Sequence, residues 1–446
     1  MKVIVLVDGE HYPPVTRWGI AAVRARGHEV LGALVVGGAE KLPAGGAADL
    51  GVPTRAAGGD VRGALAAFLD ELRPEGVVDL SDEPVLGYRE RMEIASVVLA
   101  RGLPYLGADF RLDPPIAGPP LPVPTVAVIG TGKRTGKTAI AGELARVAAA
   151  TGRDPIVVAM GRGGPPEPQV APAGSVTLAR LLELVRAGEH AASDYLEDAV
   201  TTGVTTVGAR RAGGGLAGAP YVSSVRPAAD RAVSLGAGLV VLEGSGSSVP
   251  PVPWDAGVLV VPASVNPEYV AGYLGPLRLL LSDLVVVTMS NDPAGHENLP
   301  TLRSHVRRLR DDARLVATVF EPLPLGDVRG RDVFFTTTAP APVAARQAER
   351  LEEAHGCRVV GWSARLADRA GLVEEMEAAP RYDVLLTELK AAAVDVACDL
   401  ALRRGAEVVF CDNRAIALEG EPDLLGELER TIGLAERRFD ERREGT

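Results

Sequence analysis

Cysteine and long apolar runs are scarce in this 446-residue chain, and each absence excludes a class of protein. The three cysteines, Cys357, Cys398 and Cys411, follow no spacing typical of a metal site or a disulfide framework, which indicates a reducing compartment. No apolar run approaches the length needed to span a membrane. The opening MKVIVLV is too short for the core of a signal peptide, and acids follow it directly. We therefore expect a cytoplasmic protein with no membrane partner.

An excess of positive charge is also absent. The formal net charge is −11, which argues against general affinity for nucleic acid or anionic membranes. A phosphorylated ligand would therefore need a local basic pocket. Only five of the basic residues are lysines, and in such a background a lysine is expected where a compact ammonium is required. Lys133 and Lys137 share one Gly-rich stretch, whereas Lys390 in TELKAAAVD is explained equally well by chance.

The chain is long enough for two or three domains, and apolar strand-like runs alternate with helical stretches along it. This alternation predicts an α/β protein with mostly parallel, doubly wound sheets. The proline-rich LDPPIAGPPLPVP continues neither element type and is typical of a linker. We predict a Rossmann-like N-terminal domain, this linker, a central domain, and a Rossmann-like C-terminal domain ending in a charged helix, over residues 1–111, 112–124, 125–328 and 329–446.

A Gly-rich stretch, AVIGTGKRTGKTAI, opens the central domain between a buried strand and a helix. Such a turn offers backbone N–H groups and a helix N-terminus to an anion, which favours a P-loop over a structural turn with chance lysines. We expect Lys137 to bind the outer phosphates of a nucleotide and Thr138 to coordinate Mg²⁺. The predicted nucleotide-binding residues are Gly130, Thr131, Gly132, Lys133, Arg134, Thr135, Gly136, Lys137, Thr138 and Ala139.

The loop is one residue longer than the usual pattern, with five residues between Gly130 and Gly136. Two of the five are the cations Lys133 and Arg134, which a nucleotide alone does not require. They suit a second polyanion facing the γ-phosphate and a transition state whose charge spreads over phosphoryl oxygens. Lys133, Arg134 and Lys137 are therefore the candidate catalytic residues.

The glycine spacing of GTGKRTGKT resembles that of dethiobiotin synthetase and its relatives, a P-loop branch that activates acids with ATP. In that branch the magnesium-binding acid closes a buried strand as a Glu-Gly pair, and LVVLEGSGSS supplies Glu243 at such a position. An ordinary acid at a strand end is the alternative reading. In VTMSND, Asn291 occupies a position where base specificity is often read, and it favours ATP over GTP.

Polar residues gather between the loop and the Glu-Gly strand. Arg162 follows a strand end between glycines, and the Arg210–Arg211 pair precedes three glycines, which suits capture of phosphate or carboxylate better than a solvated surface. His190 and Asp194 in EHAASDYLEDA are further substrate-binding candidates. For the acids of this stretch, a capped helix start explains the pattern as well.

Nine stretches in a fixed order make a wider resemblance specific: VDGEHYPPVT, GTGKRTGKT, AMGRGGPPEP, EHAASDYLEDA, GARRAGGGLAG, LEGSGSS, FFTTTAP, LTELKAAAVDVA and CDNR. With these the chain resembles the cyclic 2,3-diphosphoglycerate synthetase family over essentially its whole length. One departure is Ala212, where we would expect cysteine. Alanine and cysteine are both small, so we expect the replacement to have little effect.

The resemblance implies a central P-loop domain between flanking α/β domains, in a homodimer. It implies that ATP, with Mg²⁺, drives closure of 2,3-diphosphoglycerate to its cyclic form, releasing ADP and phosphate. It also makes Asp8, Glu10 and His11 substrate-binding candidates, although a turn held by the following prolines explains them nearly as well. Lys390 is a further substrate-binding candidate, and Arg414 could add another cation from the third domain.

Two other functions compete with this one. An ATP-dependent ligase of the dethiobiotin or cobyrinic acid type would phosphorylate a carboxylate and needs fewer cations around the γ-phosphate. A nucleotide-switched protein, such as a metallochaperone or a partitioning NTPase, would turn over slowly without a small substrate. The cysteine positions do not support the metallochaperone.

Overall fold

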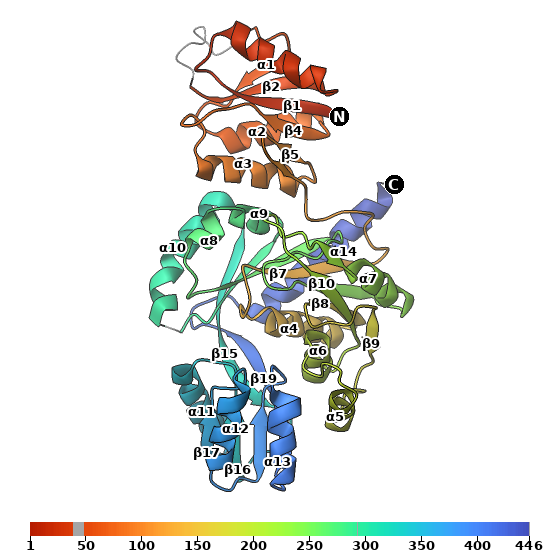
Figure 1. Cartoon of the computed structure of the whole chain (residues 1–446), viewed down its shortest axis with the longest axis vertical. Helices are drawn as coiled ribbons and strands as arrows, with labels where there is room; N and C mark the ends of the chain where they lie inside the picture. The colour runs from red at the N-terminus through yellow and green to blue at the C-terminus, as the bar shows by residue number, and fades with distance from the viewer. Residues whose placement is uncertain (39–48, 292, 446) are drawn as a thin grey trace.

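The computed structural model describes residues 1–38, 49–291 and 293–445, which form three units stacked along one axis (Figure 1). The N-terminal unit is a sheet in the order β3-β2-β1-β4-β5-β6, parallel except for the last pair. Its elements are β1 (Lys2–Asp8), α1 (Pro13–Ala25), β2 (Glu29–Gly37), β3 (Thr54–Ala56), α2 (Val61–Leu72), β4 (Gly76–Asp79), α3 (Tyr88–Ala100), β5 (Tyr105–Leu106) and β6 (Arg111–Leu112).

The central unit is built on the order β11-β10-β8-β12-β7-β13-β14-β15, and its strands from β10 to β15 are parallel neighbours. Its strands are β7 (Thr125–Gly130), β8 (Pro155–Gly161), β9 (Gln169–Ala171), β10 (Thr206–Ala212), β11 (Val222–Ser223), β12 (Leu239–Glu243), β13 (Ala256–Pro262), β14 (Leu284–Thr288) and β15 (Arg314–Pro324). Its helices are α4 (Lys137–Ala150), α5 (Leu178–Arg186), α6 (Asp194–Thr202), α7 (Val225–Ser234), α8 (Glu268–Ala271), α9 (Gly275–Leu280) and α10 (Pro293–Leu309). Apolar runs such as Val126–Ile129 are fully buried because helices cover both faces of the sheet.

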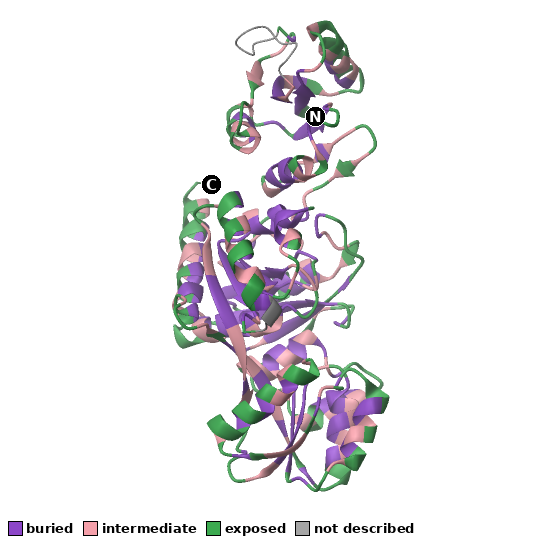
Figure 2. Cartoon of the chain, turned by 90° about the vertical axis from the view of Figure 1, so that its left-hand side faces the viewer, coloured by how far each residue is buried: buried purple, intermediate pink, exposed green. Residues whose placement is uncertain are grey.

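The C-terminal unit continues the same sheet in the order β19-β18-β16-β17. Its elements are β16 (Asp332–Thr336), α11 (Ala341–His355), β17 (Arg358–Ser363), α12 (Arg369–Ala378), β18 (Val384–Thr387), the π-helix η2 (Ala393–Cys398), α13 (Asp399–Arg403), β19 (Glu407–Ala417) and α14 (Leu424–Glu444). The long strands β15 and β19 pair antiparallel and carry the sheet from one unit into the other (Figure 2). The α/β fold class predicted from the sequence is confirmed.

The helical pattern of LKAAAVDVACDLALRRG predicts one helix, but the structure differs at its start. Lys390 lies in a turn after β18, and Ala391 has a positive φ of 48°. The π-helix begins only at Ala393 and passes into α13. The left-handed residue interrupts helix formation, so Lys390 is held on a turn rather than on a helix face.

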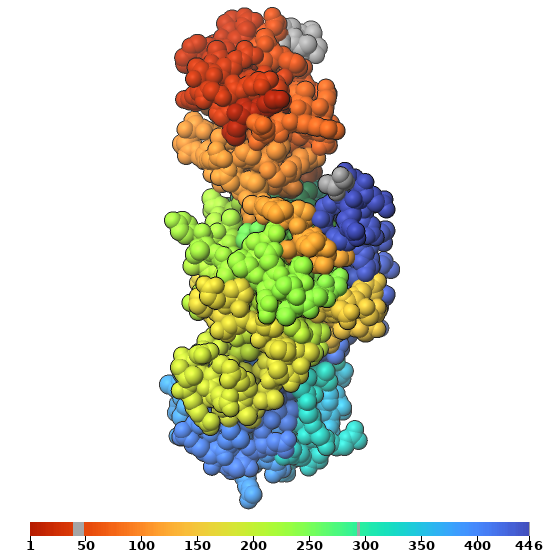
Figure 3. Space-filling view, turned by 90° about the vertical axis from the view of Figure 1, so that its right-hand side faces the viewer, coloured from red at the N-terminus to blue at the C-terminus, as the bar shows by residue number. Residues whose placement is uncertain are grey.

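The C-terminal and central units also meet beside the joined strands. Leu178 at the start of α5 packs against the C-terminal core, and Leu389 and Val394 belong to an apolar cluster that includes Leu181 and Leu196 of the central unit. Figure 3 shows the yellow-green α5 region against the blue C-terminal unit. The two units therefore form an apolar contact in addition to the shared sheet.

Helix α14 follows the C-terminal unit in sequence but lies against the central one, over α4, β7 and β13 (Figure 1). Leu428, Ile432 and Ala435 recur at helical spacing and are fully buried in the central core. Arg438 pairs with Asp283, which fixes the end of the helix. Within the described ranges, no helix combines the length and apolarity that crossing a bilayer requires.

Replacing Ile432 by alanine should destabilise the protein by about 2 to 5 kcal/mol, because the side chain is fully buried beneath α14. The matched control is Leu425→Ala on the same helix, where 44% of the residue is exposed and a change below about 0.5 kcal/mol is expected. Chemical denaturation followed by circular dichroism measures both. Equal losses for the two variants would show that α14 does not contribute to the central core.

Candidate active site

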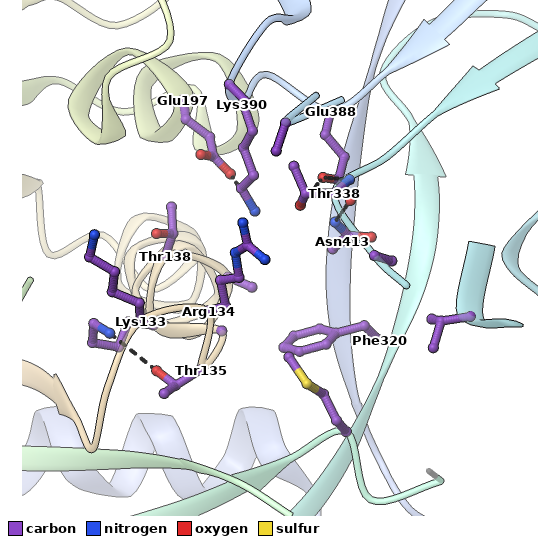
Figure 4. Close-up of a pocket in the computed structure, with 18 of the residues that line it drawn as sticks. Lys133, Arg134, Thr135, Thr138, Glu197, Phe320, Thr338, Glu388, Lys390 and Asn413 are labelled. Carbon is purple, nitrogen blue, oxygen red and sulfur yellow. Dashed lines mark hydrogen bonds and ion pairs between the residues drawn. The ribbon is translucent and has the colours of Figure 1, made fainter. Parts of the chain in front are cut away.

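A cavity of about 1100 Å³ lies between the central and C-terminal units (Figure 4). On the central side it is lined by the P-loop and by residues that follow β8, β12 and β14. On the other side it is lined by residues 338–341, 388, 390, 391 and 413. Ligands of open α/β sheets collect at the carboxyl ends of the strands, and this cavity has that position.

The P-loop connects β7 to α4 as the sequence predicts. Gly136 has a φ of 90°, and a Cβ there would lie 2.4 Å from the Phe320 ring, so both conformation and space require glycine. Lys137 folds back over the loop, and its Nζ donates to Gly132 O at 2.6 Å and to Thr135 Oγ1 at 3.1 Å. The residues from Lys133 to Ala139 line the cavity. Gly130, Thr131 and Gly132 form the first half of the loop.

Lys137 lies in a buried environment, and burial lowers its pKa to about 8. Glu243 and Asp194 oppose this shift by attraction. An ammonium with so little solvation gains more from an anion than an exposed one does. Bound phosphate would therefore hold Lys137 in its charged form.

Thr138 and Glu243 lie together, as a shared metal site requires. Thr138 Oγ1 donates to Glu243 Oε1 at 2.7 Å, while the buried Glu243 Oε2 accepts no hydrogen bond from a described residue. Burial, and then the charge of Asp194, raises the pKa of Glu243 to about 7. Hard oxygen ligands with an unsatisfied buried oxygen fit Mg²⁺. No group of three or more His, Cys, Asp or Glu side chains within the described ranges could hold a metal, so nucleotide oxygens and water would complete the coordination.

Arg210 and Arg211, which the sequence analysis considered as one ligand-binding pair, have different environments in the structure. Successive side chains of a strand point to opposite faces, so on β10 Arg210 is exposed and donates to Gly164 O, whereas Arg211 is buried. Arg211 donates to Gly213 O and Ser245 O, both at 2.8 Å. Burial, and then Arg162, lowers the pKa of Arg211. Arg211 thus ties together the turns after β10 and β12, and neither arginine lines the cavity.

Of the other central candidates, Arg162 and Asp194 line the cavity. The His190 ring is exposed and lies over Gly163, next to Arg162. Burial raises the pKa of Asp194, against the attraction of Lys390 and Lys137.

The acidic stretch after His190 is more than a capped helix. Helix α6 does begin at Asp194, but Ser193 makes no side-chain cap hydrogen bond. Glu197 lines the cavity and faces Lys390. From the sequence, Glu197 was expected only as an acid in the first turn of the helix. The one sequence signal for its position in the cavity was that it belongs to EHAASDYLEDA, one of the nine stretches that carry the family resemblance.

The C-terminal unit brings Lys390 into the cavity together with residues that the sequence did not single out. Lys390 Nζ lies 3.2 Å from Glu197 Oε1. Glu388 accepts hydrogen bonds from Thr337 Oγ1, Thr338 N and Oγ1, and Asn413 Nδ2 at 2.7 to 3.0 Å. Thr337 and Thr338 belong to FFTTTAP, and Asn413 belongs to CDNR. The family resemblance of these two stretches was the only sequence signal that their residues contribute to the site.

Arg414 does not reach the cavity. It pairs with Glu143 on α4 at 2.5 Å, and it is absent from the cavity lining. Its neighbour Asn413 faces the cavity instead, since adjacent strand residues point to opposite faces.

An apolar part of the cavity lies away from Lys390, where Figure 4 shows Phe320. Met289, Val319, Phe320 and Val343 line it, with Asn291 at the same end of β14. Flat apolar walls with a few polar groups are typical of a nucleobase site. Asn291 lines the cavity, and its role in base recognition stays a prediction.

The N-terminal candidates lie elsewhere. Asp8 accepts from His11 Nδ1 at 2.9 Å and from the backbone N–H groups of Glu10 and Asp82. These residues form a compact turn at the end of β1, and none of them lines the cavity. The structure does not bring them together with the P-loop.

Comparison with known proteins gives a consistent result. Family models described as the N-terminal, P-loop and C-terminal domains of cyclic 2,3-diphosphoglycerate synthetase match residues 2–113, 125–319 and 324–414. A cyclic 2,3-diphosphoglycerate synthetase of Rubrobacter xylanophilus is 48% identical over 437 residues, covering 97% of this chain and 98% of that protein. Enzymes of the same name from Methanothermobacter thermautotrophicus and Methanothermus fervidus are 40% and 39% identical, covering 95% and 94% of this chain and 94% of each relative.

Among solved structures, LpxK of Aquifex aeolicus in complex with ATP aligns with 85% of this chain and 99% of its own. Its sequence identity is 14% and its TM-score is 0.43. This likeness is too weak to support a conclusion about the site.

Glu243→Gln should stabilise the protein free of nucleotide and Mg²⁺ at about pH 8. The folded-state pKa of Glu243 is raised to about 7 from the ordinary 4.5, so its contribution to stability is complete below the unfolded value and is lost as pH rises through the folded value. Removing this charge is expected to add at most about 3 kcal/mol at about pH 8 and much less at about pH 5. Denaturant titrations at the two pH values measure the difference, with exposed Glu349→Gln as control. A gain of the same size at both pH values would contradict the assignment.

Proposed function

Because the chain belongs to the cyclic 2,3-diphosphoglycerate synthetase family, we propose that it is an ATP-dependent synthetase that closes 2,3-diphosphoglycerate to its cyclic form. The products are the cyclic diphosphoanhydride, ADP and inorganic phosphate. The observation that carries this function is the match of all three family domains in order, together with a relative of that name that is 48% identical across 97% of this chain.

The reaction divides into two displacements. The γ-phosphoryl group of ATP passes to an oxygen of one substrate phosphate, which releases ADP. An oxygen of the neighbouring phosphate then attacks the inner phosphorus of this new diphosphate and expels inorganic phosphate. Because both phosphates are attached to one glycerate, the second step depends on holding them in reacting geometry.

Electrostatic repulsion between two polyanions is the main obstacle, and the cavity offers cations on both sides. Lys137 and the loop N–H groups suit the outer phosphates of ATP. Figure 4 shows Lys133 and Arg134 at the loop tip, with Lys390 extending toward them from the other unit. Arg162 also lines this cavity. We assign these four cations to the substrate phosphates and to the charge that develops in transfer.

Thr138 and Glu243 are the residues that would hold Mg²⁺. When bound there, the ion neutralises charge on the β- and γ-phosphates of ATP. The apolar walls around Phe320 suit the adenine ring, with Asn291 as the polar group beside it. Arg211 then acts indirectly, by fixing the turn that contains Gly246 next to Lys133.

The homodimer implied by the family resemblance and a reducing cytoplasm are part of the same proposal. All three cysteines are buried free thiols, which suits a reducing compartment. His190 and Arg210 belong to the outer edge of the proposed substrate site, because each lies beside the glycines that follow β8. Among the residues that the structure describes, Asp8, Glu10 and His11 make no hydrogen bond or ion pair with the cavity lining, so this proposal gives them no part in the reaction.

Purified protein mixed with ATP, Mg²⁺ and 2,3-diphosphoglycerate should convert the two phosphomonoester signals of ³¹P NMR into anhydride signals as ADP appears. Lys137→Ala should lower the rate at least about 100-fold, because it removes the ammonium that faces the transferred phosphoryl group. Lys2→Ala, an exposed lysine of the N-terminal unit, is the control and should retain full activity. ATP hydrolysis without change in the diphosphoglycerate signals would instead favour a carboxylate-activating ligase.

Arg211→Gln should raise KM for 2,3-diphosphoglycerate about tenfold while KM for ATP changes little. The variant leaves the carbonyls of Gly213 and Ser245 without their donor, so the turn beside Lys133 loses its position. Arg180→Gln, on the exposed face of α5, is the matched control. Initial-rate kinetics with each substrate varied in turn provide the measurement, and an unchanged KM for diphosphoglycerate would refute the role.

A further inference from the structure

Lys390 differs from the other lysines of the cavity in being held by an acid from the opposite unit. It follows β18 of the C-terminal unit, and Glu197 lies on α6 of the central unit. Figure 4 shows Lys390 Nζ on the side of Glu197 that faces Arg134 and Lys133. For Lys133 and Lys137, by contrast, no ion pair within 4.0 Å is found among the described residues.

The second acid beside Lys390 is not free to move. Glu388 is buried, and hydrogen bonds from Thr337, Thr338 and Asn413 hold both of its oxygens. Burial opposes ionisation of this carboxyl, but Lys390 and these hydrogen bonds lower its pKa below the ordinary value. Glu388 therefore provides a fixed negative charge, and Glu197 decides where the ammonium of Lys390 points.

The ammonium needs such support in order to stay charged. Burial alone lowers the pKa of Lys390, but Glu197 and then Glu388 reverse this and raise the pKa above its ordinary value. Glu197 itself faces Lys390, Asp194 of its own helix, and Glu388. Burial raises the pKa of Glu197 to about 8, with Lys390 opposing the shift. Glu197 thus carries more negative charge as pH rises and becomes a stronger partner for the Lys390 ammonium.

We propose that Glu197 is a positioning residue for this reaction: it holds the Lys390 ammonium, across the boundary between the two units, in the place where a phosphate of the substrate binds. Lys390 is then the substrate-binding group, and Glu197 acts only through it. The identity of the substrate in this proposal rests on the proposed function. The pairing of the two residues rests on the 3.2 Å contact and the cavity geometry.

The alkaline range gives the sharpest test, because substrate phosphates are fully ionised above about pH 8 and only protein groups titrate. KM for 2,3-diphosphoglycerate is measured at saturating ATP and Mg²⁺ between about pH 7.5 and about pH 9.5. For Glu197→Gln we expect KM to rise about tenfold more across this range than in the wild type, with a smaller change in kcat. The reason is that the amide no longer supports the Lys390 charge.

A double variant separates this role from a structural one. In Lys390→Arg the guanidinium stays charged throughout the range, so adding Glu197→Gln to it should leave the pH profile flat. Thermal unfolding of each variant at both ends of the range identifies loss of folding. A Glu197→Gln profile parallel to that of the wild type, or an alkaline rise that persists in the double variant, overturns the proposal.

The proposed function is tested separately, by measuring whether the wild-type protein makes the cyclic product. If the wild type makes no cyclic product, the function fails, and the inference is decided by calorimetric binding of 2,3-diphosphoglycerate to the ADP complex at the same two pH values. Weaker alkaline binding in Glu197→Gln alone, restored by Lys390→Arg, supports the inference. Equal pH dependence in all variants, or no binding to the wild type, overturns it.

Discussion

Charge neutralisation in the cavity between the central and C-terminal units is the constraint on which the site depends. Two polyanions must meet, so cations have to be concentrated, and buried cations need acids that keep them charged. The cavity meets both conditions, with Lys137 facing Glu243 and Asp194 on one side and Lys390 between Glu197 and Glu388 on the other. An isolated cluster of cations of this density would repel itself and shed protons.

The joined sheet brings the two sides of the cavity together. Because β15 and β19 run through both units, the segment that follows β18 lies opposite the P-loop helix, and the apolar contact at α5 supports it. Arg146 and Arg414 pair with Glu143 and Asp412, so β19 is also fixed to α4, the helix that carries Lys137 and Thr138. The helix that follows the P-loop and the C-terminal unit are thus linked through partly buried ion pairs.

The sequence predicted the parts of the site that are local. Strand, Gly-rich turn and helix are contiguous, so the P-loop and the roles suited to Lys137 and Thr138 follow from spacing alone. Alternation of strands and helices is likewise a local pattern, and the α/β fold class that it predicts is confirmed by the structure. The nine short stretches predict the family, which the three family models confirm. Glu243 was predicted as the magnesium-binding acid from the resemblance to the dethiobiotin synthetase branch, and the structure places it in hydrogen-bond contact with Thr138 at the carboxyl edge of the sheet.

Tertiary structure alone decided which of the remaining candidates meet. Arg210 and Arg211 are neighbours in sequence but point to opposite faces of β10, and Asp8, Glu10 and His11 belong to a unit that does not line the cavity. Glu197 and Glu388 look like a helix acid and a strand-end acid in the sequence, yet both face Lys390. Spacing along a chain determines local conformation, whereas contacts between distant segments depend on how the sheet continues from one unit to the next, and no local pattern encodes that continuation.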